Sequence, residues 1–508
     1  MSSSKKDLMV NRSSPSMSWR NTRYKRFYEI VDQLVSEVQQ LVWKETNTVK
    51  RRLGGNELAK LHYSIECLVR DCMAVVLQRK RKGEATIKLG QYNYGSTRSD
   101  LMLTYKVHVQ RAFKALIEME YLQVSQSGFY DRKGRKDGTA TSRLTRYVAT
   151  DKLLKLFTSE ELKSLPALVP VYADPELIKV RLKEKDQHGV FRKVSVPFTK
   201  SQETDRIYTN LEIINKALSK HWYDLEISDN SLVQLQERLA NDQTNPRQLR
   251  FDQRSLYRVF NDPELTTGGR FYGGWWQNIP KEYRSHLTIN GKSTVELDYS
   301  NQHPSILYAQ EGLVRPADCY SGVIPPELTP QTASLSDLRG MIKAAFNAML
   351  NSPKPLSQPP NGVYPKAFGL TWRQVSESIL KFHEPIAHHF YTGIGLKLQR
   401  LDSDIAEKVL LYFSQKYIPV LPLHDSFLMH HGYESTLKPV MEAAFKEIVG
   451  VTPLVDQKKT SRLEDSSNTI QDDFFGPNLS DELSEILTEL DVGYENRLAA
   501  FRTLIQTN

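Results

Sequence analysis

The stretch VELDYSNQHPSILY (295–308) opens with Val-Glu-Leu, a β-type run that predicts a strand ending at Asp298. A second β-type run, VLPLH (420–424), leads into Asp425. Each aspartate therefore stands at or near the end of a predicted strand. An aspartate in such a place is more often a turn former than a catalytic group, so neither segment is decisive alone.

Two carboxylates at the ends of adjacent strands are a common way to hold hard divalent cations such as Mg²⁺. Two such ions can clamp the attacking and the leaving oxygen when a nucleotide is joined to a 3′ end. The backbone at Asp298 and Tyr299 could add a carbonyl ligand. The chemistry of nucleotide transfer is thus one hypothesis for the pair Asp298 and Asp425.

The segment DLRGMIKAAFNAMLN (337–351) places Arg339, Lys343, Asn347 and Asn351 at intervals of four residues, on one face of a predicted helix. A cationic stripe beside a metal site can neutralise a triphosphate and orient the departing pyrophosphate. The alternative is the polar face of an ordinary surface helix.

Taken in order, four segments resemble the palm and fingers motifs of the family A (DNA polymerase I-like) DNA polymerases and of the related single-subunit phage and mitochondrial RNA polymerases. They are TTGGRFYGGWWQNIP (266–280), VELDYSNQHPSILY, DLRGMIKAAFNAMLN and LQRLDSDIAEKVLLYFSQKYIPVLPLHDSFLM (398–429). The resemblance spans roughly residues 250–450. It implies a right-hand fold and two Mg²⁺ or Mn²⁺ ions.

The resemblance also implies roles for single residues. Asp298 and Asp425 would be the metal ligands, with Tyr299 adding its backbone. Arg339 and Lys343 would bind the phosphates of the incoming nucleotide. The remaining positions, Arg270, Gln399 and His424, would contact the primer and template.

Three departures from the family pattern leave the choice of sugar open. His303 replaces the glutamate that selects the sugar, and Asn347 and Asn351 replace an aromatic residue and a tyrosine. Ser426 follows His-Asp, as in the RNA polymerase branch. No acidic cluster upstream resembles a proofreading exonuclease.

The basic charge is concentrated at the N-terminus. Residues 1–150 hold 28 Lys and Arg against 14 Asp and Glu, whereas the remainder holds 40 against 45. Such a module is suited to phosphate-rich partners, although a solvated basic face is an alternative. Helical periodicity over residues 23–43, 57–78 and 105–121, followed by strands near 121–125 and 143–150, predicts a winged helix-turn-helix.

In this interpretation the third helix lies in the major groove and the tip of the hairpin contacts phosphates. Use of the module for protein contacts or packing is the alternative. The helix would present Lys106, His108, Arg111 and Lys114, and the wing would present Arg132, Lys133, Arg135 and Lys136.

The predicted fold class is therefore α+β, with palm, fingers and thumb preceded by a winged helix-turn-helix. We expect a disordered tail, a winged-helix module, a helical connector or thumb, the palm and fingers, and an acidic tail with a helix. Their predicted bounds are 1–20, 21–155, 156–260, 261–455 and 456–508.

The predicted function is template-directed polymerisation on DNA, acting on primer, template and nucleoside triphosphates in the replication or repair of a mobile element or its host. A primase or RNA polymerase and a non-catalytic DNA-binding regulator are the alternatives. No apolar run approaches the roughly 18 residues of a membrane span. Three cysteines and no signal peptide favour the cytoplasm.

Three smaller sets of residues have structural or functional alternatives. Cys67 and Cys72 with His62 could bind a metal but lack a fourth ligand, so buried thiols are favoured. Trp275 and Trp276 could stack on bases or pack in the core. The last set, His383, Glu384, His388 and His389, could bind a metal, but a polar helix face is favoured.

Overall fold

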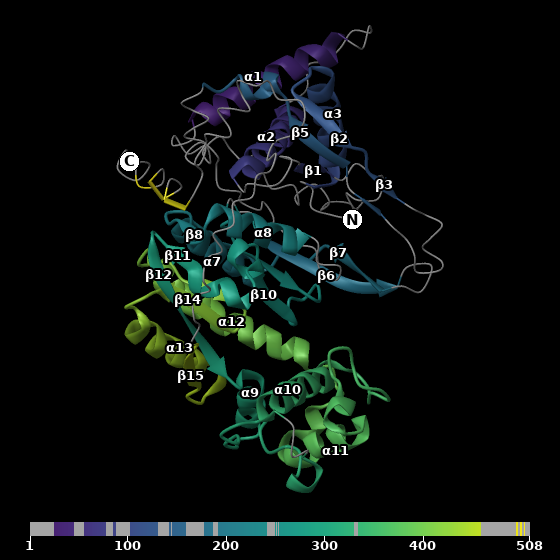
Figure 1. Cartoon of the computed structure of the whole chain (residues 1–508), viewed down its shortest axis with the longest axis vertical. Helices are drawn as coiled ribbons and strands as arrows, with labels where there is room; N and C mark the ends of the chain where they lie inside the picture. The colour runs from purple at the N-terminus through teal and green to yellow at the C-terminus, as the bar shows by residue number, and fades with distance from the viewer. Residues whose placement is uncertain are drawn as a thin grey trace, which may run out of the picture.

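The structure is a computed structural model of the whole chain (Figure 1). It describes residues 25–44, 55–77, 85–87, 102–130, 142–143, 145–158, 177–185, 191–240, 249, 251, 253–329, 334–458, 494–495, 498–499 and 502. The predicted tail 1–20, most of the predicted tail 456–508 and the four wing residues Arg132, Lys133, Arg135 and Lys136 lie outside these ranges. The described elements form a mixed α+β fold, which confirms the α+β part of the predicted class.

Three helices build the N-terminal part: α1 (Lys25–Lys44), α2 (Gly55–Leu77) and α3 (Met102–Glu118). Their apolar faces enclose a core cluster of their own. The buried residues of α1 recur every three or four positions, which is why the helical spacing was visible in the sequence. They include Phe27, Ile30, Leu34 and Val38.

A small antiparallel sheet accompanies these helices, in the order β1 (Ala85–Ile87), β5 (Thr145–Ala149), β2 (Leu122–Gln126). Beyond it, β3 (Phe129–Tyr130) pairs with β4 (Ser142–Arg143) and extends the β2–β5 hairpin. The short helix α4 (Asp151–Leu154) follows. Helix, helix, strand, helix, strand, strand is the element order expected for the predicted winged helix.

The segment predicted to be a helical connector contains strands as well as helices. The strands β6 (Ile178–Lys185) and β7 (Phe191–Val196) form a hairpin that extends to the right in Figure 1. β6 also pairs in parallel with β9 (Tyr257–Phe260), which pairs with β10 (Gly268–Tyr272). The helical expectation was therefore incomplete. The remaining elements are α7 (Gln202–Leu218), β8 (Tyr223–Leu225) and α8 (Asp229–Ala240).

A larger sheet is centred on β12 (Lys292–Ser300). β12 pairs with β14 (Ser426–His430) on one side and with β15 (Leu454–Lys458) on the other. The edges are completed by β13 (Leu421–Leu423), which pairs with β14, and by β11 (Leu287–Ile289) and β8. All these pairings are antiparallel, and the partners in β12 and β14 are 128 to 136 positions apart in sequence (298 to 426 and 294 to 430).

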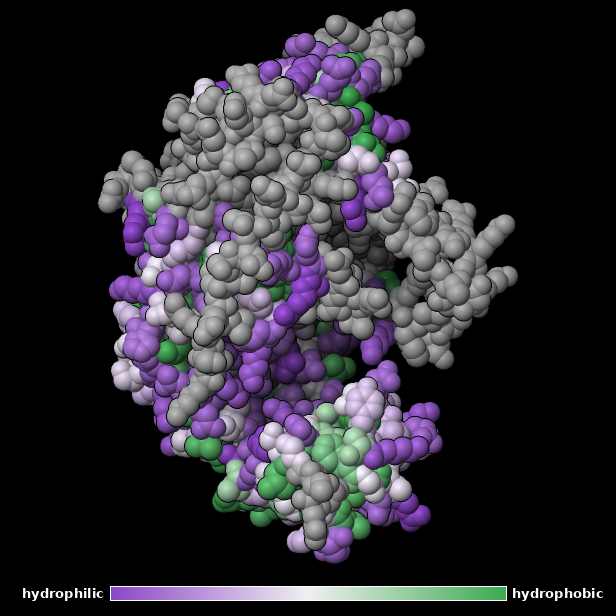
Figure 2. All heavy atoms as spheres, in the orientation of Figure 1, coloured by the Kyte–Doolittle hydropathy of each residue, from purple (hydrophilic) through white to green (hydrophobic). Residues whose placement is uncertain are grey.

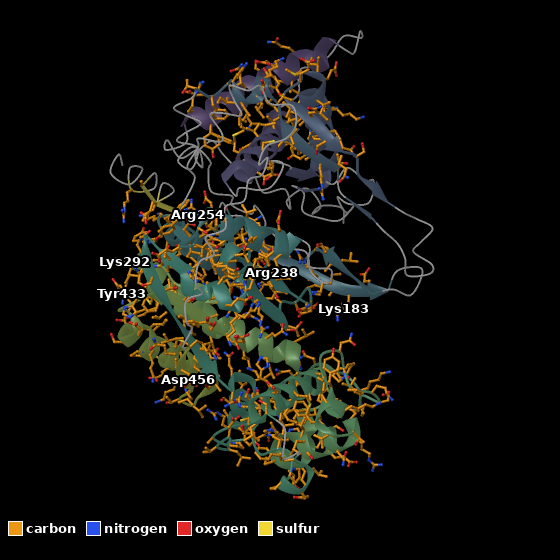
Figure 3. All side chains as sticks on the ribbon, viewed as in Figure 1. Lys183, Arg238, Arg254, Lys292, Tyr433 and Asp456 are labelled. Carbon is orange, nitrogen blue, oxygen red and sulfur yellow. The ribbon has the colours of Figure 1, made fainter. Side chains whose placement is uncertain are left out.

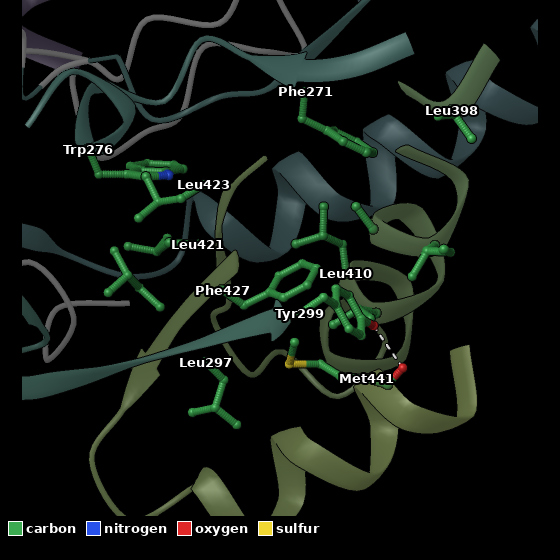
Figure 4. Packing of buried hydrophobic residues seen from close by; sticks show 14 of the residues in the cluster. Phe271, Trp276, Leu297, Tyr299, Leu398, Leu410, Leu421, Leu423, Phe427 and Met441 are labelled. Atoms are coloured by element: carbon green, nitrogen blue, oxygen red, sulfur yellow. Dashed lines mark hydrogen bonds between the residues drawn. The ribbon is translucent and has the colours of Figure 1, made fainter. Parts of the chain in front are cut away.

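One face of this sheet packs on α12 (Gly395–Ser414) and α13 (Glu434–Val449). Figure 4 shows the buried side chains between these layers, including Leu297, Phe427 and Met441. The hydroxyl of Tyr299 donates a hydrogen bond to the Met441 carbonyl at 2.7 Å. Because side chains alternate along a strand, Glu296 and Asp298 of β12 point to the opposite face of the sheet from Leu297 and Tyr299.

A helical part follows β12: α9 (Gln302–Gln310), α10 (Leu335–Asn351) and α11 (Trp372–Phe382). Figure 1 shows these helices at the foot of the view. Short 3₁₀ turns join the elements: η4 (Trp275–Asn278), η5 (Lys281–His286), η6 (Pro326–Leu328), η7 (Pro365–Phe368) and η8 (Glu384–His389).

The surface is hollowed between this helical part and the sheet, and mostly hydrophilic residues border the hollow (Figure 2). Among the described residues, no helix has both the length and the apolar character needed to cross a membrane.

Candidate active site

The two predicted metal ligands lie side by side. In the β12–β14 pair, Asp298 is directly opposite Ser426. His424 and Asp425 form the two-residue turn between β13 and β14. His424 adopts a left-handed backbone conformation there, with φ +65°. The backbone N–H of Tyr299 donates to the Asp425 carbonyl at 3.5 Å. Residues 127 positions apart thus meet at one end of the sheet.

The carboxylate of Asp298 is in an unfavourable environment for a single negative charge. Burial raises its pKa, and the charge of Asp425 raises it further. The Lys458 ammonium opposes both effects from 2.5 Å. The charge of Asp425 repels that of Asp298, so a cation bound between the two carboxylates would relieve this repulsion.

The third strand, β15, adds polar groups that the sequence did not reveal. Asp456 lies directly opposite Asp298, and Lys458 lies opposite Glu296. Figure 3 shows Asp456 at this sheet. Glu296 is only 7% exposed, and it accepts hydrogen bonds from Ser426 at 2.8 Å and from Arg284 at 3.2 Å.

These residues fit a site for divalent cations. Two carboxylates repel each other, a third faces them from β15, and an ammonium already bonds to one of them. Carboxylate oxygens are the ligands that Mg²⁺ and Mn²⁺ prefer. Asp298 and Asp425 would hold the ions, with Asp456 nearby. The side chain of Tyr299 is buried, so only its backbone is available.

Arg270, in the middle of β10, is held by a buried carboxylate. Its guanidinium donates to Asp402 of α12 at 2.8 Å, and Asp402 is 1% exposed. The β9–β10 pairing shifts between Gly268 and Arg270, where Gly268 and Gly269 have positive φ. A Cβ on Gly269 would lie 2.8 Å from the Ser403 hydroxyl, so only glycine allows β10 to approach α12 this closely.

A buried guanidinium from the neighbouring strand β9 also binds α12. Arg258 of β9 is fully buried and donates to Glu407 at 3.0 Å, to Asp404 at 3.0 Å and to Ser403 at 2.8 Å. It also donates to the Gly269 carbonyl at 2.6 Å. This network fixes the bulge that precedes Arg270.

His424 is close enough to Arg270, Asp402 and Asp425 for their charges to act on its imidazole. Burial lowers its pKa, and the charge of Arg270 lowers it further. Its ring is 5.6 Å from that of Tyr272 on β10. His424, Arg270 and Asp402 are therefore brought together beside Asp425, as the resemblance implied for the first two. Gln399 is half-buried one turn before Asp402 on α12.

The cationic face of α10 is only partly free to meet a triphosphate. Lys343 is exposed, and its charge acts on both Asp298 and His303. Arg339 instead donates to Asp318 at 2.7 and 3.1 Å. Its guanidinium also lies 5.3 Å from the centre of the Tyr320 ring. The sequence did not reveal this pairing.

His303 is the second residue of α9, five positions after Asp298 in the sequence. Burial lowers its pKa to about 4, and the charges of Arg270 and Lys343 act in the same direction. The imidazole is thus neutral at pH 7. The Asn351 side chain binds within α10 and packs on α12. Its amide N–H donates to the Asn347 carbonyl at 2.7 Å, and its amide oxygen lies so close to Gly395 that a Cβ at that position would clash with it.

No protein-family model matches the chain, and no curated protein matches it. Among solved structures, the POL domain of Pol1 from M. smegmatis in complex with DNA primer-template and dNTP is similar at 10% identity and a TM-score of 0.28. The match covers 76% of this chain and 80% of that one. At this identity and TM-score the likeness does not assign a function to the chain.

The N-terminal helix α3 presents fewer groups than predicted. Arg111 is half-buried and Lys114 is exposed, whereas the side chain of Lys106 lies outside the described residues. The inclusion of His108 in a DNA-reading face was wrong. Its side chain is 2% exposed and bonds to Glu57 of α2 at 2.8 Å, since it belongs to the inner face of α3.

Two of the open alternatives are decided in favour of packing. Trp275 and Trp276 are fully buried in the core. Cys72 is buried, and His62 bonds to Asp32 at 2.8 Å. Burial raises the pKa of the Cys67 thiol to about 11, so a thiolate ligand is disfavoured there.

Proposed function

We propose that this chain is a template-directed nucleotidyltransferase that extends a nucleic acid strand on DNA by a two-metal mechanism. The observation that carries the proposal is the pairing of Asp298 with Ser426, which brings Asp298 and Asp425 together at one end of a sheet. The family A resemblance of residues 250–450 gives the same two residues the same role.

In this mechanism divalent ions supply the charge that stabilises the attacking and leaving oxygens. Asp298 and Asp425 would hold those ions, and the Lys458 ammonium would then have to leave Asp298. Lys343 is free to bind the triphosphate. Arg339 either leaves Asp318 to join it or holds Tyr320 in place through that pair.

Primer and template would lie over β10, the β13–β14 turn and α12. Arg270 is preorganised for this task because Asp402 fixes its guanidinium and leaves it 22% exposed. Preorganised donors lose little entropy when a ligand binds. His424 and Gln399 would complete the contact, as the resemblance implies.

We further propose that the N-terminal part binds duplex DNA as a winged helix. The element order and the basic excess of residues 1–150 support this role. In the full chain, Arg111→Ala with Lys114→Ala should weaken duplex binding and lower its dependence on salt. Lys155→Ala, at an exposed site after α4, is the control. Equal binding by all three proteins would remove Arg111 and Lys114 from the interface.

The sugar is proposed to be deoxyribose, because the neutral imidazole of His303 places bulk near Asp425 and Lys343. A primase or RNA polymerase remains the second candidate. It is favoured by Ser426, whose hydroxyl is committed to Glu296. We place the activity in the cytoplasm, in keeping with free cysteines such as Cys72.

A primer-extension assay tests the proposal with dNTPs and NTPs side by side on one primed DNA template. Incorporation that requires template and Mg²⁺ is expected, with dNTPs preferred. Efficient use of NTPs alone would transfer the assignment to the RNA polymerase candidate. No incorporation of either, together with tight duplex binding, would favour a non-catalytic regulator.

A further inference from the structure

A second group of metal-binding side chains lies between α9 and η8, away from the paired aspartates. The sequence placed His383 and Glu384 in one polar cluster with His388 and His389. The structure separates them. His383 is fully buried and bonds to the Tyr308 hydroxyl at 3.0 Å and to the Cys319 carbonyl at 2.9 Å.

The remaining two histidines meet a glutamate from another element. The Nε2 atoms of His388 and His389 lie 3.1 and 2.9 Å from the same Oε1 atom of Glu311, which follows α9. All three potential ligand atoms lie within 4.8 Å of one another. We call Glu311, His388 and His389 the α9–η8 cluster.

These separations match the needs of a small tetrahedral ion. Zn²⁺ binds nitrogen and carboxylate oxygen at about 2.0–2.2 Å, so neighbouring ligand atoms on it are roughly 3.3 Å apart. The measured separations from Glu311 are 2.9 and 3.1 Å. Both separations from Glu311 are therefore compatible with the binding of one ion, and the third ligand atom lies within 4.8 Å.

The backbone around the cluster is fixed independently of any ion. The buried Tyr308–His383 hydrogen bond joins α9 to the start of η8, one turn before Glu311. After η8, Phe390 is buried and the Tyr391 N–H donates to the Met349 carbonyl at 2.9 Å. A metal site on such a frame loses little entropy on binding.

We propose that the α9–η8 cluster binds one Zn²⁺ ion, or a similar first-row transition-metal ion, with water in the open position. Two imidazoles and one carboxylate are a known zinc donor set that keeps one position open. Imidazole nitrogen discriminates against Mg²⁺, which prefers oxygen ligands. The ion would fasten η8 to the end of α9, the helix that begins near His303.

The cluster has access to solvent, which metal entry requires. The side chains of His388, Glu311 and His389 are 59%, 30% and 16% exposed. The competing explanation is a hydrogen-bonded group without metal, in which the imidazoles donate to Glu311. The two explanations differ in what they predict for added Zn²⁺. The inference does not depend on the proposed polymerase function.

The test is titration of the full chain with Zn²⁺, and separately with Co²⁺, in excess Mg²⁺. An Asp298→Asn, Asp425→Asn background removes metal binding by the paired aspartates. His389→Ala and Glu311→Gln are the test variants, and Glu311→Gln keeps the size of the side chain if His389→Ala fails to fold. His431→Ala is the matched control, because His431 is a 72% exposed histidine that also faces a glutamate.

We expect one equivalent of Zn²⁺ to bind despite the Mg²⁺, and to raise the melting temperature. Co²⁺ should give the intense visible absorption of four-coordinate nitrogen and oxygen ligation. Glu311→Gln should weaken binding by more than the roughly 10–100-fold typical of losing an outer-shell partner. The control should bind like the parent. Absence of stoichiometric binding, or equal binding by Glu311→Gln, would overturn the proposal.

Discussion

Lys458 provides a sensitive probe of the paired aspartates, because its ammonium bonds to Asp298 at 2.5 Å. The change Lys458→Met removes the charge and keeps a long, unbranched side chain on β15. Without the ammonium, Asp298 and Asp425 repel each other with no bound cation between them. We therefore expect the metal-free protein to lose stability and its affinity for Mg²⁺ to rise.

The expected loss of stability in Lys458→Met depends on how exposed the Lys458–Asp298 ion pair is. Two unit charges about 4 Å apart attract by about 4 kcal/mol at an effective dielectric constant of about 20. Water reduces this attraction, since the Lys458 side chain is 41% exposed and that of Asp298 is 15% exposed. Exposed pairs contribute about 0.2–1 kcal/mol, and breaking a buried pair costs about 3–5 kcal/mol. We expect about 1–2 kcal/mol here.

In the wild-type protein a divalent ion must displace the ammonium, whereas in Lys458→Met it need not. The same 1–2 kcal/mol should then appear as Mg²⁺ binding that is tighter by a factor of about 5–30. Thermal melts over a series of Mg²⁺ concentrations measure both effects.

Lys408→Met is the matched control for these melts. Its ammonium is 40% exposed and lies 2.7 Å from Glu447, outside the site. This variant should leave the affinity for Mg²⁺ unchanged. Equal Mg²⁺ affinity in Lys458→Met and the wild type would refute the reasoning.

Three further predictions concern the frame and the sugar. Arg258→Met should destabilise the protein by up to about 3–5 kcal/mol in urea, because the 4% exposed Glu407 then keeps only the 46% exposed Arg206 as its charged partner. Arg238→Met, at a side chain that is 54% exposed, should cost under about 1 kcal/mol; similar losses would contradict this. Burial lowers the pKa of His430 to about 4. Between about pH 6.5 and 4 this histidine is therefore protonated in the unfolded chain but neutral in the folded chain, and the free energy of unfolding falls as the pH drops through this range. The loss is at most about 3 kcal/mol, and His430→Gln should reduce this slope while His431→Gln does not. His303→Gly should raise NTP use relative to dNTP use roughly tenfold or more if the imidazole excludes the 2′-hydroxyl by bulk; lower NTP use would mean that it binds that hydroxyl.

The sequence predicted those parts of the fold that local patterns determine. The apolar spacing of α1 and α10 is a property of each helix alone, so their bounds agree with the structure within a few residues. Asp298 and Asp425 were predicted as neighbours because each ends a β-type run. Their pairing through Ser426 confirms that they are close.

The parts that were missed depend on contacts between distant segments. Lys458 and Asp456 enter the site only because β15 pairs with β12, and nothing in a charged run such as DQKK marks that pairing. Asp402 resembles any polar residue of a helix until β10 delivers Arg270 to it. The β6–β7 hairpin was missed for a different reason, since β6 carries a local signal that was not used. Ile178, Val180 and Leu182 alternate with charged residues, which is the pattern of a strand with one buried face.

Single-turnover extension of a primed DNA template by the full chain tests the central claim most directly. Asp298→Asn and Asp425→Asn are compared with the wild type, and duplex binding by each protein is followed by fluorescence anisotropy. Metal-held charge is worth several kcal/mol in the transition state, and about 1.4 kcal/mol is tenfold in rate. The account predicts that each variant binds the duplex normally and extends it at least about 1,000-fold more slowly. Near-normal extension by either variant would contradict it.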